Sequence, residues 1–151
     1  MEIHQEPEVI ARGQVTLTSP PGGIELAARN VDRMLRHWDT RGYGQWAVVE
    51  RATARVIGCV GFLHPENAAL ELGWIFRRSR WGNGFATEAG RAAIDWAFRT
   101  GRIDYVMSLI GKDNRASIRV ATKIGQRFER ESISPLDGQQ VLIYGIRKGG
   151  V

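Results

Sequence analysis

Residues 71–88 read Glu-Leu-Gly-Trp-Ile-Phe-Arg-Arg-Ser-Arg-Trp-Gly-Asn-Gly-Phe-Ala-Thr-Glu. An apolar run typical of a strand passes into a turn that contains Gly82 and Gly84, and an alanine-rich amphipathic stretch follows. The two glycines remove side chains where a ligand would approach the backbone. The free N–H groups at the start of the following helix, and the positive end of its dipole, favour an anion at that point. The stretch therefore predicts a phosphate-binding turn between a strand and a helix.

Two common phosphate motifs do not fit this turn. The P-loop needs Gly-Lys followed by Ser or Thr, but Gly84 is followed by Phe85 and Ala86. The dinucleotide-binding motif needs a third glycine, and this chain has Thr87 there. We therefore expect a phosphate-bearing ligand other than a mononucleotide or NAD.

Two blocks of sequence resemble those of a known family. Residues 81–89, Trp-Gly-Asn-Gly-Phe-Ala-Thr-Glu-Ala, resemble the acetyl-CoA signature of the GNAT N-acetyltransferase superfamily, in the branch of the RimJ/RimL-like ribosomal-protein N-terminal acetyltransferases. Trp81 stands where the signature has Gln or Arg. Residues 114–125, Asn-Arg-Ala-Ser-Ile-Arg-Val-Ala-Thr-Lys-Ile-Gly, resemble a second block of that branch, whose closing Phe is Gln126 here. The resemblance covers residues 38–147, and two blocks in the right order are more specific than either alone.

The resemblance implies an α+β (α/β) fold, with a mixed, mostly antiparallel twisted sheet and helices on both faces. Apolar spacing predicts the same order of elements along a single domain, residues 1–151, which begins with an irregular segment over 1–23. The expected helices cover residues 24–41, 85–100 and 114–124, and the expected strands cover 46–50, 56–63, 69–77, 105–110, 128–132 and 141–147.

The first strand and first helix of the family are expected to be missing, because nothing before Glu6 can supply them. The chain is then either a natural short form or a truncated one. Val48 and Val49 would lie on an unpaired sheet edge, which tends to recruit another strand. Residues 8–18, with their alternating apolar positions, are one candidate cover, and a partner chain is the other. We expect a homodimer on this basis.

The resemblance implies transfer of an acetyl group from acetyl-CoA, as co-substrate, to a primary amine of a protein N-terminus or a small molecule. The amine attacks the thioester directly, so no covalent intermediate is needed. Glu71 is the candidate base, with a structural, ion-paired glutamate as the alternative. Ser117 is the candidate acid, with a first-turn helix residue that satisfies backbone donors as the alternative. Both residues have counterparts in this branch of the family.

The resemblance also implies a set of cofactor contacts. Backbone groups of Ile75 and Phe76 are expected to meet the pantetheine arm, and Asn114 is expected both to bind that arm and to cap its helix. Three arginines beside the turn, at 77, 78 and 80, would attract a polyanionic cofactor. The complete set of expected cofactor-binding residues is Ile75, Phe76, Arg77, Trp81, Gly82, Asn83, Gly84, Phe85, Ala86, Thr87, Asn114 and Ser117. Three tryptophans, Trp38, Trp46 and Trp74, are expected in the core.

The composition bounds the remaining possibilities. The chain has 151 residues, a net charge of +5 and 43% hydrophobic residues, which is typical of a soluble globular domain. No apolar run approaches the ~20 residues of a membrane span, so no membrane partner is expected. A cytoplasmic location is expected because a single cysteine cannot form an intrachain disulfide, which suits a reducing compartment. Cys59, the single cysteine, is interpreted as a small core residue rather than a nucleophile. The three histidines lack ligand spacing, so no metal is expected.

Two other classes of function remain open. The first is a non-catalytic acetyl-CoA or CoA-binding module of the same fold, which Gln126 and the short front end favour. The second is a nucleic-acid-binding domain, which the net positive charge permits. The arginines are scattered and do not alternate with aromatic residues, so nucleic acid is not the favoured partner. Turnover with an amine would separate an enzyme from a binding module.

Overall fold

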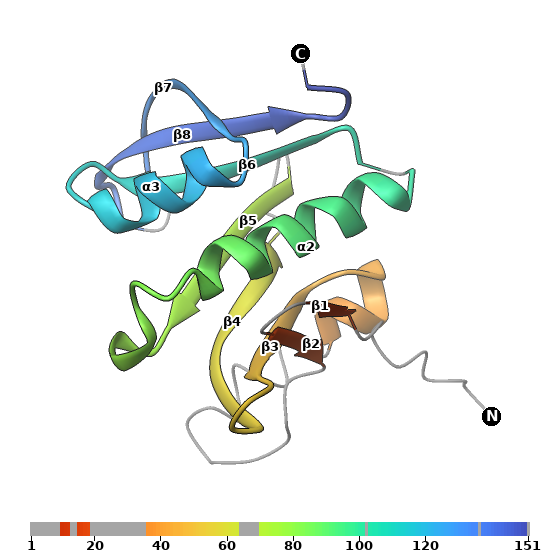
Figure 1. Cartoon of the computed structure of the whole chain (residues 1–151). Helices are drawn as coiled ribbons and strands as arrows, with labels where there is room; N and C mark the ends of the chain where they lie inside the picture. Colours follow the sequence, from red (N-terminus) through yellow and green to blue (C-terminus); the bar gives the residue numbers. More distant parts are fainter. Residues whose placement is uncertain are drawn as a thin grey trace.

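The computed structural model describes residues 10–12, 15–18, 36–63, 70–101, 103–135 and 137–150. Its strands form one sheet in the order β1-β2-β3-β4-β5-β6-β8-β7, with helices α2 and α3 packed against it (Figure 1). The strands are β1 (Ile10–Arg12), β2 (Val15–Thr18), β3 (Gln45–Glu50), β4 (Arg55–Leu63), β5 (Leu70–Phe76), β6 (Tyr105–Gly111), β7 (Arg127–Ile133) and β8 (Gln140–Arg147). The helices are the short 3-10 turn η1 (Arg78–Arg80), α2 (Phe85–Arg99) and α3 (Arg115–Lys123).

The predicted mixed, mostly antiparallel sheet is confirmed, since only β5 and β6 pair in parallel. From β3 onward, the element bounds agree closely with those predicted from apolar spacing. The helix predicted over 24–41 falls mostly outside the described residues, and only its last part, residues 36–41, is seen to be helical.

The edge beside β3 differs from the prediction. β2 pairs antiparallel with β3, placing Leu17 opposite Val48 and Thr16 opposite Val49, and β1 continues the sheet beyond β2. The expectation that β3 is an unpaired edge is therefore wrong. Of the two candidate covers, it is residues 15–18 of the same chain that satisfy the backbone donors and acceptors of β3. The homodimer argument that rested on this edge loses its premise.

An aromatic cluster fills the core between α2 and the sheet. The ring of Trp46 lies 5.0 Å from Trp38 and 5.1 Å from Trp96, in edge-to-face contacts, and Phe62 stacks on Trp96 at 6.0 Å. Such pairs add about 0.5–1.5 kcal/mol each beyond burial. The helix meets these rings with small buried side chains, which let it lie close to the sheet: Ala89, Ala92, Ala93 and Ala97. Trp38 and Trp46 are core residues, as predicted.

The sheet opens between β5 and β6. Only two residue pairs, Leu70 with Val106 and Glu71 with Met107, are in register before the two strands separate. β5 stays paired with β4 as far as Phe76, and β6 stays paired with β8 along its whole length. The sheet is thus two well-paired parts joined at one end and separated at the other. Because β5 and β6 run in parallel, the chain leaves both strands at the open end, where α2 and α3 begin (Figure 1).

Candidate active site

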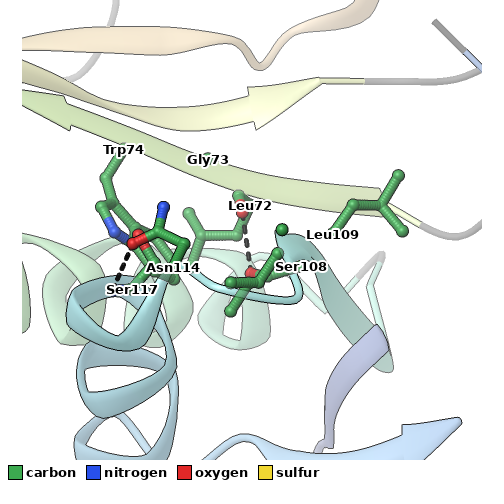
Figure 2. A pocket seen from close by; sticks show the side chains of 9 residues that line it. Leu72, Gly73, Trp74, Ser108, Leu109, Asn114 and Ser117 are labelled. Atoms are coloured by element: carbon green, nitrogen blue, oxygen red, sulfur yellow. Dashed lines mark hydrogen bonds between the residues drawn. The ribbon is translucent and has the colours of Figure 1, made fainter. Parts of the chain in front are cut away.

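A cleft of about 150 Å³ occupies the space between the separating strands (Figure 2). At its closed end the buried Ser108 hydroxyl donates a hydrogen bond to the Leu72 carbonyl oxygen at 2.8 Å. The lining comes from β5, from β6 and from the first turn of α3, namely Leu72, Gly73, Trp74, Ser108, Leu109, Ile110, Gly111, Asn114 and Ser117. Since the sheet ladder is interrupted here, backbone groups of β5 are available to a ligand.

The register of β5 decides which backbone groups face the cleft. Arg77 N–H donates to the Ile57 carbonyl of β4 at 2.8 Å. Because backbone groups alternate in direction along a strand, Ile75 also directs its N–H and C=O toward β4, while Trp74 and Phe76 direct theirs away from β4, toward the open side. The predicted role of Phe76 fits this register, whereas that of Ile75 does not. Trp74, expected in the core, is only partly buried and borders the cleft.

The glycine turn has the predicted conformation. Gly82 and Gly84 have φ values of 79° and 80°, and a Cβ at either position would meet nothing within 4 Å in the described part of the chain. Gly84 is the N-cap of α2 and the first helical hydrogen bond runs from Glu88 N–H to the Gly84 carbonyl at 3.0 Å. The N–H groups of residues 85–87 therefore have no acceptor within the helix. The turn presents unobstructed donors, which is the geometry that an anion needs.

Two side chains stiffen the segment that leads into the turn. The Asn83 amide donates to the carbonyl oxygens of Arg80 at 3.2 Å and Trp81 at 3.1 Å. The Trp81 indole N–H donates to the Phe76 carbonyl at 3.0 Å, and 58% of the Trp81 side chain surface stays exposed. The Arg78 guanidinium lies 6.0 Å from the centre of the Trp81 ring. Asn83 thus shapes the turn, and Trp81 offers a fixed, exposed aromatic surface beside it.

The three arginines predicted to attract a polyanion differ in whether an acidic side chain pairs with them. Arg80 makes a 3.1 Å ion pair with Glu50 at the end of β3, so its charge is already offset. Arg77 and Arg78 are exposed on the approach to the glycine turn. The positive potential beside the turn therefore comes mainly from Arg77 and Arg78.

Asn114 and Ser117 meet at the start of α3, on the opposite side of the cleft (Figure 2). The Asn114 side-chain oxygen accepts a hydrogen bond from Ser117 N–H at 3.1 Å, so Asn114 is the N-cap, as predicted. The capping role considered for Ser117 is therefore filled by Asn114. The Ser117 hydroxyl and the Asn114 NH₂ group are left for other partners.

Glu71 pairs with Met107 in the last pair of residues before β5 and β6 separate, next in sequence to Leu72 of the cleft lining, and is not itself a lining residue. Its side chain is half-buried, and burial raises the pKa of the carboxyl above its ordinary value. Within the described part of the chain, Glu71 has neither an ion-pair nor a hydrogen-bond partner. The alternative of an ion-paired structural glutamate finds no support there.

One hydrogen bond between α2 and α3 was not predicted from the sequence. The Arg91 guanidinium of α2 donates to the Lys123 carbonyl at the end of α3 at 2.8 Å. On the same helix, a Cβ at Gly90 would lie 3.2 Å from the Ile124 side chain, so the glycine allows α3 to pack closely. These contacts fix the relative position of α2 and α3, and the first turn of α3 lines the cleft. Contacts between residues 32 positions apart leave no local sequence signal.

Three further features of the described residues concern metal binding, membrane spans and the single cysteine. None of them form a group of three or more His, Cys, Asp or Glu side chains that could hold a metal ion. No described helix is long and apolar enough to cross a membrane. Cys59 is partly buried on β4, and burial raises the pKa of its thiol, which disfavours the nucleophilic thiolate.

Comparison with known proteins identifies the family. The family described as "Acetyltransferase (GNAT) domain" matches residues 1–127. The chain belongs to the GNAT acetyltransferase family. Among curated relatives, this GNAT chain is 34% identical over 109 residues to the uncharacterized protein YkkB of Bacillus subtilis, across 65% of the chain and 63% of YkkB. It is 28% identical over 109 residues to the uncharacterized N-acetyltransferase p20 of Bacillus licheniformis, across 70% of the chain and 60% of p20. The aligned region thus spans less than two thirds of either relative.

Solved structures share the fold of this GNAT chain. Ribosomal-protein-S5-alanine acetyltransferase from Vibrio fischeri superposes with a TM-score of 0.76 at 13% identity, over 94% of this chain and 97% of that one. RimL, the ribosomal L7/L12 alpha-N-protein acetyltransferase solved with coenzyme A, gives a TM-score of 0.79 at 17% identity, over 95% and 100%. At these identities the likeness shows the fold alone. The expected family is confirmed, and its ribosomal-protein branch is present among the structural neighbours.

Proposed function

We propose that this GNAT chain transfers an acetyl group from acetyl-CoA to a primary amine by direct attack of the amine on the thioester. The observation that carries the proposal is the cleft between β5 and β6, because the first turn of α3 lines it and β5 leads from it to the turn at which α2 begins. One helix start presents free N–H groups and the other presents Asn114 and Ser117. Membership in an acetyltransferase family supports the same conclusion.

The cofactor is placed along this path by its chemistry. The pyrophosphate binds the N–H groups of residues 82–87, where the helix dipole and Arg77 favour negative charge. The pantetheine arm follows the cleft, where the outward backbone groups of Trp74 and the NH₂ group of Asn114 match its amides. The thioester then lies between β5 and β6.

The reaction needs two proton transfers. The amine nitrogen attacks the thioester carbonyl carbon, the C–S bond breaks, and the nitrogen loses a proton as the amide forms. Glu71 accepts that proton, directly or through water, and its raised pKa makes it a better base than an ordinary glutamate. Ser117 supplies a proton to the departing thiolate, since its hydroxyl lies in the cleft.

The acceptor is an amine of a protein N-terminus or of a small molecule. A homodimer and a cytoplasmic location stay predictions from the sequence. The alternative function is a CoA-binding module without catalysis, which the buried Gln126 in place of the family Phe still favours.

One assay separates the two functions. The purified chain is incubated with acetyl-CoA and a panel of small amines and peptides, free CoA is measured with a thiol reagent, and the acetylated product is identified by mass spectrometry. We expect amine-dependent release of CoA that Glu71→Gln largely abolishes. CoA binding by calorimetry, with no amine acetylated at any pH between 6 and 9, would instead establish the binding module.

A further inference from the structure

Three glycines lie within the paired strands β4 and β5, where a glycine costs about 0.5–1 kcal/mol relative to alanine. The fold explains two of them. A Cβ at Gly58 would collide with the Ile75 carbonyl oxygen, and a Cβ at Gly61 would collide with the Gly44 carbonyl oxygen. Backbone from a neighbouring strand takes the space that a side chain would need. Gly58 and Gly61 are therefore packing residues.

No steric conflict of this kind explains the glycine at residue 73. It lies opposite Gly61 on β5, its φ is not in the left-handed region, and among the described residues a Cβ there would meet only the Leu63 Cδ1 atom, at 4.0 Å. That is an ordinary van der Waals distance. An alanine at residue 73 would therefore fit the folded structure. Packing does not explain why this residue is a glycine.

The position of Gly73 beside the cleft offers an explanation for the missing side chain. The cleft is lined by residues from both faces of the sheet, with Leu72 and Trp74 on the α2 side and Gly73 and Leu109 on the other. It therefore passes between the strands to the face that carries Glu71, as the positions of Leu72, Gly73 and Trp74 along β5 illustrate (Figure 2). Gly73 is the residue at which the passage reaches that face.

The described strand neighbours of Gly73 on that face include one carboxyl and two aliphatic side chains. Glu71 and Ile75 are its neighbours two residues away on the same side of β5, and Leu63 faces Glu71 across from β4. Ile75 is 71% exposed and Leu63 is 38% exposed. The free space therefore has a proton acceptor at one end and two uncovered aliphatic walls.

We propose that Gly73 is a specificity-determining residue, whose missing side chain admits the part of the acceptor beyond its first two carbon atoms, between Leu63 and Ile75. This inference rests on the proposed acetyl transfer. The acceptor class that fits is a primary amine on an apolar carbon chain, without an acidic group next to the nitrogen, because a carboxylate there would face Glu71. An added methyl group at residue 73 would narrow this space from the β5 side.

The test compares Gly73→Ala, Leu63→Ala and the double variant with the parent chain, using acetyl-CoA with ethylamine, hexylamine and phenethylamine. We expect Gly73→Ala to keep its melting temperature and its affinity for CoA. Its kcat/KM should fall about tenfold or more for phenethylamine, and much less for ethylamine, because one carbon group too many in an apolar pocket typically changes kcat/KM by about 10–200-fold. Removing the Leu63 side chain in the double variant should restore phenethylamine turnover, because the space reopens from the β4 side.

The possible outcomes distinguish failure of the role proposed for Gly73 from failure of the proposed acetyl transfer. If the parent acetylates amines and Gly73→Ala lowers turnover of all three equally, or of none, Gly73 does not select the acceptor while the proposed function stands. Failure of the double variant to recover phenethylamine turnover would also overturn the role of this space. A parent chain inert toward all amines, while still binding CoA, would overturn both proposals together.

Discussion

The buried Ser108 hydroxyl donates to the Leu72 carbonyl at 2.8 Å, one position beyond the last residue pair that joins β5 to β6. The side chain thus continues the ladder for one step where the two backbones have already separated. This hydrogen bond sets where the cleft begins.

Ser108→Ala should widen the closed end of the cleft. The Leu72 carbonyl loses its donor in a position where Ser108 itself is 1% exposed, so we expect a loss of about 1–3 kcal/mol in the free energy of unfolding. The KM for acetyl-CoA should rise several-fold while kcat changes less. Ser132→Ala on β7 is the matched control, with no effect expected on either. An unchanged KM in Ser108→Ala would show that the hydrogen bond does not shape the cleft.

Glu71→Gln should remove the acid limb of the pH–rate profile and lower kcat about 10²–10⁴-fold, as is typical for loss of a general base. Binding of CoA should stay the same. Kinetics between pH 5 and 9 check this. A variant that keeps the parental profile would leave Glu71 without a role in proton transfer.

The same variant carries a prediction for stability. Because burial raises the pKa of Glu71, the folded state holds its proton more tightly than the unfolded chain, so ionising Glu71 destabilises the fold as pH rises past its ordinary value of 4.5. Glu71→Gln should therefore melt at a higher temperature than the parent above the raised pKa, and the gain should vanish as pH falls below 4.5. A gain independent of pH would contradict this origin.

Gly84→Val should abolish CoA binding by calorimetry, because the side chain would occupy the space in front of the free N–H groups of α2. Valine is also strained at a φ of 80°, so a control must carry the same strain. Gly101, just beyond the other end of α2, has a φ of 72° and equally open surroundings. Gly101→Val should be destabilised similarly and still bind CoA. Equal binding by both variants would move the pyrophosphate elsewhere.

Asn114 allows its capping and binding roles to be separated. Asn114→Asp keeps an oxygen that can accept from Ser117 N–H but loses the NH₂ donor, whereas Asn114→Ala loses both. We expect Asp to keep the melting temperature and weaken CoA binding, and Ala to lower both, with a capping loss of about 0.5–2 kcal/mol. If Asn114→Asp bound CoA as tightly as the parent, the residue would be a cap alone.

Gln126→Met should stabilise the protein. Gln126 is 2% exposed, and neither its amide nitrogen nor its amide oxygen has a hydrogen-bond partner among the described residues. Replacing the amide with an apolar chain of similar size removes an unsatisfied buried group, worth about 1–3 kcal/mol. Chemical denaturation measures the gain, with exposed Gln140→Met as the control. A destabilised Gln126→Met would mean that the amide has a bonding role.

The sequence by itself determined the elements from β3 onward and the turn before α2. Local chemistry dictates these features: alternation of apolar residues marks the strands, small residues mark the buried face of α2, and Gly82 and Gly84 permit the left-handed backbone of the turn. Asn114 could be recognised as a cap because a cap acts within one helical turn.

Only the tertiary structure decided which strands pair and which backbone groups are left over. β2 pairs with β3, although the sequence predicted that β3 is an exposed edge. Strand pairing depends on the path of a segment that is distant in the sequence. The register of β5 turns Trp74 and Phe76, not Ile75, toward the open side, and a shift of one residue would reverse this. That a side chain would fit at residue 73 follows only from its distance to Leu63 in the folded chain, because free space depends on tertiary packing.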